Sequence, residues 1–304
     1  MMPSPRWSAA PSLAVSSSST ERAPALSVKA PTVAGDRFLK VDGMRLRVRR
    51  QGSGTPMLLI NGLGACLDGW EPLVKRLPDR DLIMVDHPGT GRSETPKRLL
   101  SMSEIARLYV SVLDSLGVEH FDVLGFSFGG TVAQQVARDF RGRVTSVILA
   151  GTSCGLGGFP ADPFTLVVAS NPMRYQFAAM RELSAPFIYR GRVGRCPELF
   201  ETELKGWQAH KADLTGVYYQ VLAFSGWSSL PWLWTLRVPT LVLGGSEDPM
   251  APAVNSHLLA SLIPRAELHI VKDGGHLFPF DRAEETSKRI IGFLSRVHPV
   301  VAAA

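Results

Sequence analysis

The stretch VLGFSFGGTVAQQ, residues 123–135, holds three glycines within six positions and one serine among them. An apolar run precedes Ser127 and a helical pattern follows it, with Gly125, Gly129 and Gly130 at the junction. Glycines relieve collisions where a strand turns sharply into a helix, and such a turn exposes the residue at its tip. The pattern therefore predicts a strand, a tight turn that presents Ser127 as a nucleophile, and a helix.

Alternating strand and helix patterns extend this unit along the chain. Short apolar runs typical of buried strands occupy residues 57–61, 82–86, 121–125, 144–151, 240–245 and 267–273. Helical patterns occupy residues 101–118, which open with a capping box at Ser101 and Glu104, 129–140 and 282–297. A hairpin around Asp42 and Gly43 is expected over residues 37–50. This order predicts an α/β fold whose mostly parallel central sheet is flanked by helices.

The domain organisation follows from where the alternation stops. Residues 36–151 and 237–298 carry the strands, whereas residues 152–236 carry helical pieces and many aromatic residues. We therefore expect residues 152–236 to form a helical lid inserted into one core. Residues 1–35, rich in Ser, Ala and Pro, are predicted to be a disordered extension, and residues 299–304 a C-terminal tail.

The charge pattern gives no sign of a nucleic-acid partner. The net charge is +6, but the basic residues are interleaved with acidic ones and form no stripe. The densest group, Arg45, Arg47, Arg49 and Arg50, alternates along a predicted strand. Much of this group is therefore expected to face solvent.

The cysteines and the N-terminal region bear on location. Cys66, Cys154 and Cys196 are odd in number and widely spaced, which disfavours disulfides and a zinc site. Free thiols suit a reducing cytoplasm, the expected location. No apolar run reaches the roughly 18 residues of a membrane span, so none is expected. The Ser-rich, acid-poor N-terminal extension leaves an organellar transit peptide open as an alternative.

A serine nucleophile needs a base, and two later loops supply candidates. His276, in KDGGHLF, follows the strand predicted at 267–273, and Asp248, in LGGSEDPMAP, follows the strand at 240–245. A serine, an acid and a histidine in this order form the triad of one class of hydrolases. We predict that Ser127 attacks, that His276 takes its proton and that Asp248 orients the imidazole. Glu247 is the rival acid.

The negative oxygen of a tetrahedral intermediate needs hydrogen-bond donors. One is expected to be the backbone N–H of Phe128, which follows the nucleophile. The other is expected from the loop INGLGACLDGW, where we choose the N–H of Leu63 between Gly62 and Gly64.

The same glycines allow a competing interpretation as a dinucleotide cradle. Gly62 and Gly64 fit its first two glycines and Asp86 ends the next strand, but Leu67 occupies the third position. No cofactor is therefore expected. The remaining histidines lack ligand spacing, so no metal is expected, and His87 receives no catalytic role.

These residues resemble those of the α/β-hydrolase superfamily over residues 36–298, and more narrowly the intracellular medium-chain-length poly(3-hydroxyalkanoate) depolymerases. The narrower likeness rests on LLINGLGA, ASNPMRY, GVYYQVLAFSGWSS and LHIVKDGGHLF. The resemblance implies an α/β-hydrolase fold with an inserted lid, Ser127 as nucleophile, Asp248 as acid and His276 as base. It also implies a granule-bound or oligomeric polyester as substrate, cleaved to 3-hydroxy acids, and the surface of polyhydroxyalkanoate granules as a partner; a small ester is the alternative substrate.

Asn61, where many other relatives have His, belongs to the matching stretch LLINGLGA. The chain departs from the narrower family in two respects. Phe128 stands where the family often carries Trp, and the N-terminal extension is longer than usual. Serine at the turn favours hydrolysis over polymerisation, because the related synthases carry cysteine there. The lid aromatics are expected either to line a slot for the alkyl side chain or to fix the lid to the core.

Three functions therefore remain open at this level. The first is hydrolysis of poly(3-hydroxyalkanoate) or its oligomers through an acyl-enzyme. The second is a small-molecule carboxylesterase or carbon–carbon bond hydrolase of the same fold. The third is a granule-binding protein without catalytic activity.

Overall fold

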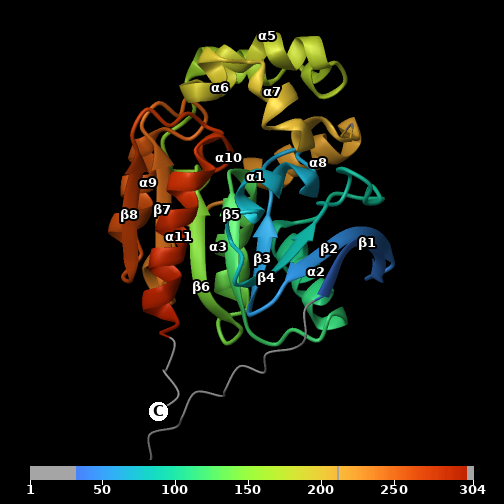
Figure 1. The fold of residues 1–304 in the computed structure, drawn as a ribbon, viewed down its shortest axis with the longest axis vertical. Coiled ribbons are helices and arrows are strands. Elements are labelled where there is room, and N and C mark those ends of the chain that lie inside the picture. Colours follow the sequence, from blue (N-terminus) through green and yellow to red (C-terminus); the bar gives the residue numbers. More distant parts are fainter. Residues whose placement is uncertain (1–31, 211, 300–304) are drawn as a thin grey trace, which may run out of the picture.

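An eight-stranded, mostly parallel sheet forms the centre of the protein in a computed structural model that describes residues 32–210 and 212–299 (Figure 1). The strands are β1 (Thr32–Val41), β2 (Met44–Gly52), β3 (Thr55–Ile60), β4 (Arg80–Val85), β5 (Phe121–Phe126), β6 (Val144–Ala150), β7 (Thr240–Gly245) and β8 (Ala266–Val271). Their order is β1-β2-β4-β3-β5-β6-β7-β8. Strands β3 to β8 run parallel to one another, whereas β2 pairs in antiparallel fashion with both β1 and β4. The loops that follow β3, β5, β7 and β8 therefore meet at one edge of the sheet.

Helices cover both faces of this sheet. They are α1 (Glu71–Val74), α2 (Met102–Ser115), α3 (Phe128–Asp139), α9 (Ala253–Leu262), α10 (Phe278–Asp281) and α11 (Ala283–Val297), with a 3₁₀ turn η1 at Leu67–Trp70. Side chains that alternate along β3 enter two separate cores. Leu58 and Ile60 pack in a core with α2 and α3, whereas Met57 and Leu59 pack in one with α1 and α11.

The six predicted buried strands are confirmed, each within two residues at either end, and the hairpin expected over residues 37–50 is present as β1 and β2, with β1 beginning five residues earlier. The hairpin turns at Asp42 and Gly43, both of which have positive φ, as a two-residue turn of this hand requires. The capping box of Ser101 and Glu104 is present at the start of α2. The prediction missed α9, whose apolar residues do not gather on one face of the helix.

An inserted segment, residues 152–236, lies between β6 and β7 and over the sheet edge where those loops meet (Figure 1). Its helices are α4 (Pro163–Ala169), η2 (Pro172–Tyr175), α5 (Ala178–Ile188), α6 (Gly191–Arg195), α7 (Leu199–Thr202), η3 (Lys205–Gln208), α8 (Leu214–Ser225) and η4 (Leu233–Thr235). Apart from one isolated bridge between Gly155 and Ser228, its described residues pair with no strand. The helical character predicted for this stretch is thus present.

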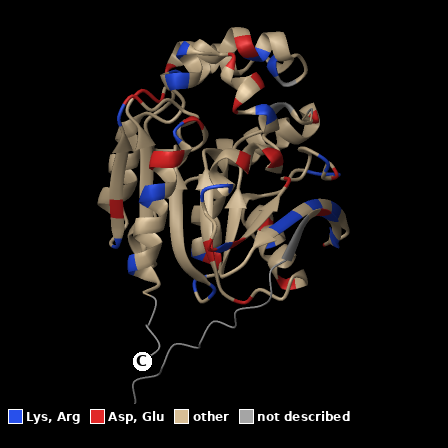
Figure 2. Ribbon diagram, in the orientation of Figure 1, with Lys and Arg blue, Asp and Glu red and all other residues tan. Residues whose placement is uncertain are grey.

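The expectation that the basic residues of β2 face solvent is wrong for Arg47. Figure 2 shows basic residues along the β1–β2 hairpin, but Arg47 is only 2% exposed. Its guanidinium lies 2.7 Å from Asp36, 2.6 Å from Asp68 and 3.3 Å from Asp86. Burial alone would raise the pKa of Asp68, but hydrogen bonds from Arg47 and Arg49 outweigh it and lower that pKa to about 2. Carboxylates from the paired strand β1 and from two loops distant in the sequence therefore surround Arg47.

The cysteines carry free thiols. Cys66 and Cys154 are buried and Cys196 is exposed. Burial raises the pKa of Cys66 to about 12. Across the described ranges, no cluster of His, Cys, Asp and Glu is arranged to hold a metal ion, and no helix there has the length and apolarity to span a bilayer.

The predicted terminal segments fall mostly outside the described residues. Strand β1 begins at Thr32, within the extension predicted for residues 1–35, and its backbone pairs with β2. The rest of that extension, its interpretation as a transit peptide and most of the 299–304 tail lie beyond the described chain.

The buried cluster around Arg47 predicts a large effect of its removal. Arg47→Ala leaves three carboxylates without their shared cation, so the free energy of unfolding in urea is expected to fall by about 3 kcal/mol or more. The control is Arg45→Ala. The side chain of Arg45 is exposed and stacks on Phe38, so its removal is expected to lower the free energy of unfolding by about 1 kcal/mol or less. Equal stabilities of the two variants would contradict the structural role of the cluster.

Candidate active site

Ser127 occupies a strained backbone position between β5 and α3. Its φ of 54° and ψ of −120° lie outside the regions that residues with side chains prefer. Its N–H donates to the carbonyl of Ala150 at 2.9 Å, and its carbonyl accepts from the Thr152 hydroxyl at 2.7 Å. The conformation is thus held from both sides, and the hydroxyl is presented at the sheet edge.

The flanking glycines are required by close backbone contacts. A Cβ atom at Gly125 would collide with the carbonyl oxygen of Gly129, and one at Gly129 would collide with the carbonyl oxygen of Ile60. Strand, helix and the neighbouring strand β3 therefore approach more closely than any side chain permits. This is the reason the opening motif needs glycine at these positions.

His276 reaches Ser127 from the loop after β8, the histidine loop (residues 272–277). Its Nε2 lies 3.0 Å from Ser127 Oγ, although the two residues are 149 positions apart in the sequence. The ring is 5% exposed and packs beside Phe126 at 5.0 Å between centroids. The backbone N–H of His276 donates to the carbonyl of Tyr189 at 2.6 Å. The inserted segment therefore fixes the position of the imidazole.

Asp248 completes a hydrogen-bonded chain behind the histidine. Its Oδ2 lies 2.8 Å from His276 Nδ1, and its Oδ1 accepts from the N–H groups of Met250 and Ala251 at 2.9 Å each. A carboxylate can only accept, so Nδ1 carries the ring proton and Nε2 is left to accept from the serine. The rival acid Glu247 instead pairs with Arg195 at 2.8 Å.

The two predicted oxyanion donors lie beside the serine in a glycine loop (residues 61–67) and at the start of α3. Within the described chain, the N–H groups of Leu63 and Phe128 donate to no protein acceptor. Both residues line the same cavity as Ser127. A Cβ atom at Gly62 would lie only 3.3 Å from the Ser127 Cβ, so the loop backbone passes close to the hydroxyl.

Comparison with known proteins assigns the chain to a family. The sequence profile of the Alpha/beta hydrolase family matches residues 57–289. The chain belongs to the alpha/beta hydrolase family. The eight-stranded sheet and the serine turn described above are in accord with this membership.

Individual relatives within the alpha/beta hydrolases carry different names. A poly(3-hydroxyalkanoate) depolymerase of Ectopseudomonas oleovorans is 39% identical over 264 residues, 86% of this chain and 92% of that protein. A 2-hydroxy-6-oxononadienedioate/2-hydroxy-6-oxononatrienedioate hydrolase of Klebsiella pneumoniae is 26% identical, over 86% of this chain and 96% of its own. The solved structure of a thermophilic esterase from Thermogutta terrifontis has a TM-score of 0.74 and 25% identity, covering 87% of this chain and 100% of that one.

A cavity of about 420 Å³ opens beside Ser127 in this alpha/beta hydrolase. Its apolar wall comes from the inserted segment and from the loop after β7, and includes Leu156, Phe159, Leu166, Val221, Phe224 and Met250. A cavity of this size and character suits a small apolar group next to the nucleophile.

The aromatic residues of the inserted segment divide into two groups. Phe159 and Phe224 line this cavity, whereas Trp207, Trp227 and Trp232 do not. Trp207 packs on Phe126 and Phe280 at centroid distances of 6.1 and 5.0 Å. Trp227 packs on Trp232, and its indole N–H donates to a glutamine of α3 at 2.7 Å. These residues fix the inserted segment to the core of the hydrolase.

The dinucleotide interpretation is excluded by the contacts of Asp86. This fully buried carboxylate accepts from the N–H groups of Leu67 and Arg92 and lies beside Arg47, so it is not available to a ribose. The neighbouring His87 packs edge-on against Phe128 at 5.3 Å. Burial lowers its pKa to about 3, so it is a neutral packing residue at physiological pH.

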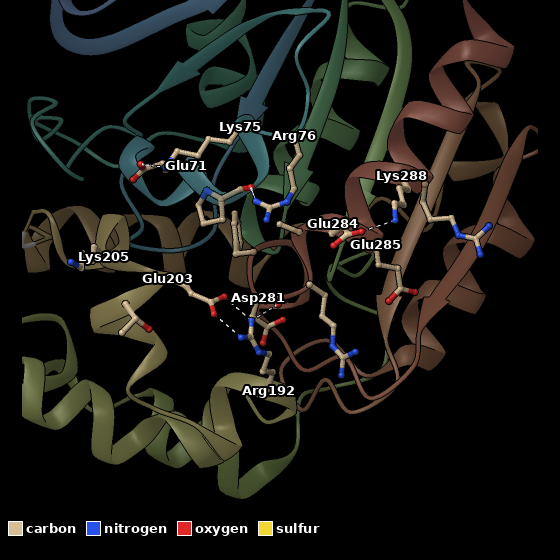
Figure 3. A pocket seen from close by; sticks show the side chains of 16 residues that line it. Glu71, Lys75, Arg76, Arg192, Glu203, Lys205, Asp281, Glu284, Glu285 and Lys288 are labelled. Carbon is tan, nitrogen blue, oxygen red and sulfur yellow. Dashed lines mark hydrogen bonds and ion pairs between the residues drawn. The ribbon is translucent and has the colours of Figure 1, made fainter.

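A larger groove of about 1060 Å³ lies elsewhere on the hydrolase, between α1, α10 and α11 and the inserted segment (Figure 3). Most of its lining is charged, and its charges pair with each other, as in Lys75–Glu71, Lys288–Glu284 and Arg192–Glu203. Ser127, Asp248 and His276 do not line it. We therefore assign the reactive chemistry to the smaller cavity.

No sequence pattern indicates the role of the Tyr189 carbonyl, because a residue of any type has a backbone carbonyl. The contact is nevertheless tight. A Cβ atom at Gly275 would collide with Tyr189 O, and one at Gly191 would collide with the backbone N of Gly275. The turn between α5 and α6 thus seats directly on the histidine loop.

The glycine contacts predict how the serine turn responds to added volume. Gly129→Ala places a methyl group against the Ile60 carbonyl, so the free energy of unfolding is expected to fall by about 1–3 kcal/mol or more, with loss of any Ser127 reactivity. Gly142→Ala is the matched control, since a methyl group there meets no atom within 4 Å. Urea unfolding measures both, and a Gly129→Ala variant as stable as the control would contradict the tight packing.

Proposed function

We propose that this alpha/beta hydrolase cleaves carboxylic esters with Ser127 as nucleophile, His276 as general base and Asp248 as the acid that orients it. The observation that carries the proposal is the continuous chain of hydrogen bonds, 3.0 Å from Ser127 to His276 and 2.8 Å from His276 to Asp248. A serine hydroxyl becomes an effective nucleophile when a positioned base removes its proton.

The proposed reaction has two halves. Ser127 Oγ adds to the ester carbonyl while its proton passes to His276 Nε2, and the resulting oxyanion accepts from the N–H groups of Leu63 and Phe128. The ester C–O bond then breaks and His276 protonates the leaving alkoxide. A water molecule then attacks the acyl carbonyl while it gives a proton to His276. The bond between the acyl carbon and Ser127 Oγ breaks, the acid leaves, and His276 returns the proton to Ser127 Oγ.

We propose poly(3-hydroxyalkanoate) or its oligomers as the substrate, cleaved to 3-hydroxy acids. The support is the 39% identity with a protein of that named activity over most of both chains. The apolar cavity beside Ser127 is consistent with an alkyl side chain on the acyl unit. Phe128, where the resemblance expects Trp, lies in its wall and is expected to affect the preferred chain length.

The surface of the inserted segment supports its proposed role as a lid that meets a polyester granule in the cytoplasm. Helices α4 and α8 carry no charged residue, yet several of their apolar side chains face solvent. The most exposed apolar residues of the segment include Phe164, Val167, Leu183, Tyr218 and Trp234. Exposed apolar patches mark surfaces that contact other apolar material. The part of this apolar surface that α4 and α8 carry, which we call the apolar patch, is next to the cavity, because both helices also line the cavity.

A second candidate is hydrolysis of a small ester or of a carbon–carbon bond. The observation that favours it is the relationship to the Klebsiella pneumoniae hydrolase and to the Thermogutta terrifontis esterase. A catalytically inactive granule-binding protein is disfavoured, since such a protein has no need of the chain from Ser127 to Asp248.

The proposed chemistry predicts complete dependence on Ser127. Ser127→Ala is expected to lower turnover of polyester and of short nitrophenyl esters by about 10⁴-fold or more, because the nucleophile is lost. Product analysis by mass spectrometry, with several polyesters as substrates, separates 3-hydroxy acid release from cleavage of small esters alone. Turnover retained by the alanine variant, or no reaction of the native protein with a fluorophosphonate at Ser127, would refute the proposal.

The apolar patch predicts that binding to polyester granules can be weakened without loss of ester hydrolysis. Phe164→Ser with Val167→Ser is expected to weaken binding to polyester granules, measured by sedimentation, about 30-fold or more, since each substitution removes apolar area worth about 1–2 kcal/mol on contact. Turnover of a short nitrophenyl ester in solution is expected to stay near that of the native protein. Ile291→Ser, on α11, is the control, and an equal loss of sedimentation in this control would contradict a patch confined to the inserted segment.

A further inference from the structure

Gln220 connects the inserted segment to the glycine loop. The residue lies on α8, is only 1% exposed, and its Oε1 accepts from the N–H of Gly64 at 3.2 Å. The two residues are 156 positions apart in the sequence. Gln220 does not line the cavity beside Ser127, so any influence on the reaction passes through the loop.

The hydrogen bonds of the glycine loop show what the glutamine contributes. The N–H of Gly62 donates to the side chain of Asn61, that of Ala65 to the carbonyl of Gly62, and that of Leu67 to Asp86. Gly64 is thus the member of the loop whose N–H is held from the inserted segment. The N–H of the preceding residue, Leu63, is left without a protein acceptor in the described chain, as an oxyanion donor must be.

Helix α8 is itself held firmly one turn before the glutamine. Gly216 packs directly against Gly89, where a Cβ atom on either residue would lie 2.5 Å from the Cα of the other. Asp213 caps the helix and accepts from the hydroxyl of Thr95 at 2.6 Å. The acceptor at Gln220 is therefore at a fixed place relative to the core.

The amide half of Gln220 argues against a role in stability alone. Its Nε2 is buried and meets no acceptor among the described residues. A buried donor without a partner destabilises a fold, so an apolar side chain would serve packing better at this site. The rest of α8 is uncharged and mostly apolar. Of the two ends of this buried amide, only the oxygen has a protein partner among the described residues.

We propose that Gln220 is a positioning residue for the oxyanion site. By holding the Gly64 N–H it sets the orientation of the peptide groups on either side of Leu63, so that the Leu63 N–H faces the reacting carbonyl. The inference rests on the proposed ester hydrolysis and adds a residue from the inserted segment to its machinery.

The experiment replaces Gln220 by Met, whose side chain has a similar length and no comparable acceptor. A second variant replaces it by Asn, whose side chain is too short for its oxygen to reach the N–H of Gly64. Both variants are expected to lower kcat for a short nitrophenyl ester about tenfold with KM nearly unchanged, because only transition-state binding is lost. Affinity for a trifluoromethyl ketone, which forms a tetrahedral adduct with serine, is expected to fall by a similar factor. Hydrogen exchange in a peptide covering residues 61–67 is expected to become faster.

Gln176→Met is the matched control. Gln176 also lies in the inserted segment and donates one hydrogen bond, to the carbonyl of Ala212 at 3.2 Å, with no contact to the glycine loop. Its kcat and exchange in residues 61–67 are expected to match the native protein. Native kcat and native exchange in both Gln220 variants would overturn the inference while leaving the dependence on Ser127 intact. Turnover that survives Ser127→Ala would instead overturn the proposed function, and the exchange measurement would still decide whether Gln220 holds Gly64.

Discussion

The hydrogen bond between His276 Nε2 and Ser127 Oγ is the interaction on which the rest of the site depends. It joins loops that follow β8 and β5, two strands separated in the sheet by β6 and β7. Parallel order brings the ends of these strands to one edge, and the strained turn at Ser127 lifts its hydroxyl above that edge. Glycines at 125 and 129 make the turn possible, because the backbones they join leave no room for a side chain.

The local patterns predicted the strands, the helix α2 with its capping box, and the meeting of Ser127, Asp248 and His276, because each depends on short stretches with a fixed chemical logic. What they missed depends on contacts between distant segments. Arg47 is buried because Asp68 and Asp86 arrive from other loops to neutralise it. Trp207 packs on Phe126 and does not reach the cavity. No pattern within α8 indicates that Gln220 bonds to Gly64.

The inserted segment contacts two of the loops that form the site. On one side the carbonyl of Tyr189 fixes the backbone of His276, and on the other Gln220 fixes that of Gly64. Helices α4 and α8 also supply the apolar wall of the cavity. A movement that lifted the whole segment away would release both the base and the glycine loop, so any opening for substrate has to be confined to parts such as α4 that carry neither contact.

The close backbone contact between the Tyr189–Gly191 turn and Gly275 limits how such enzymes can diversify. Two backbones in direct contact leave no side chain that can compensate for a shift in either one. Consider a recombinant chain that takes residues 152–236 from a relative but keeps its own residues 272–277. In that chain, two backbone surfaces that come from different proteins have to fit each other. If such enzymes acquire a new substrate range by exchanging the inserted segment, the histidine loop, which is distant in the sequence, has to be exchanged together with it.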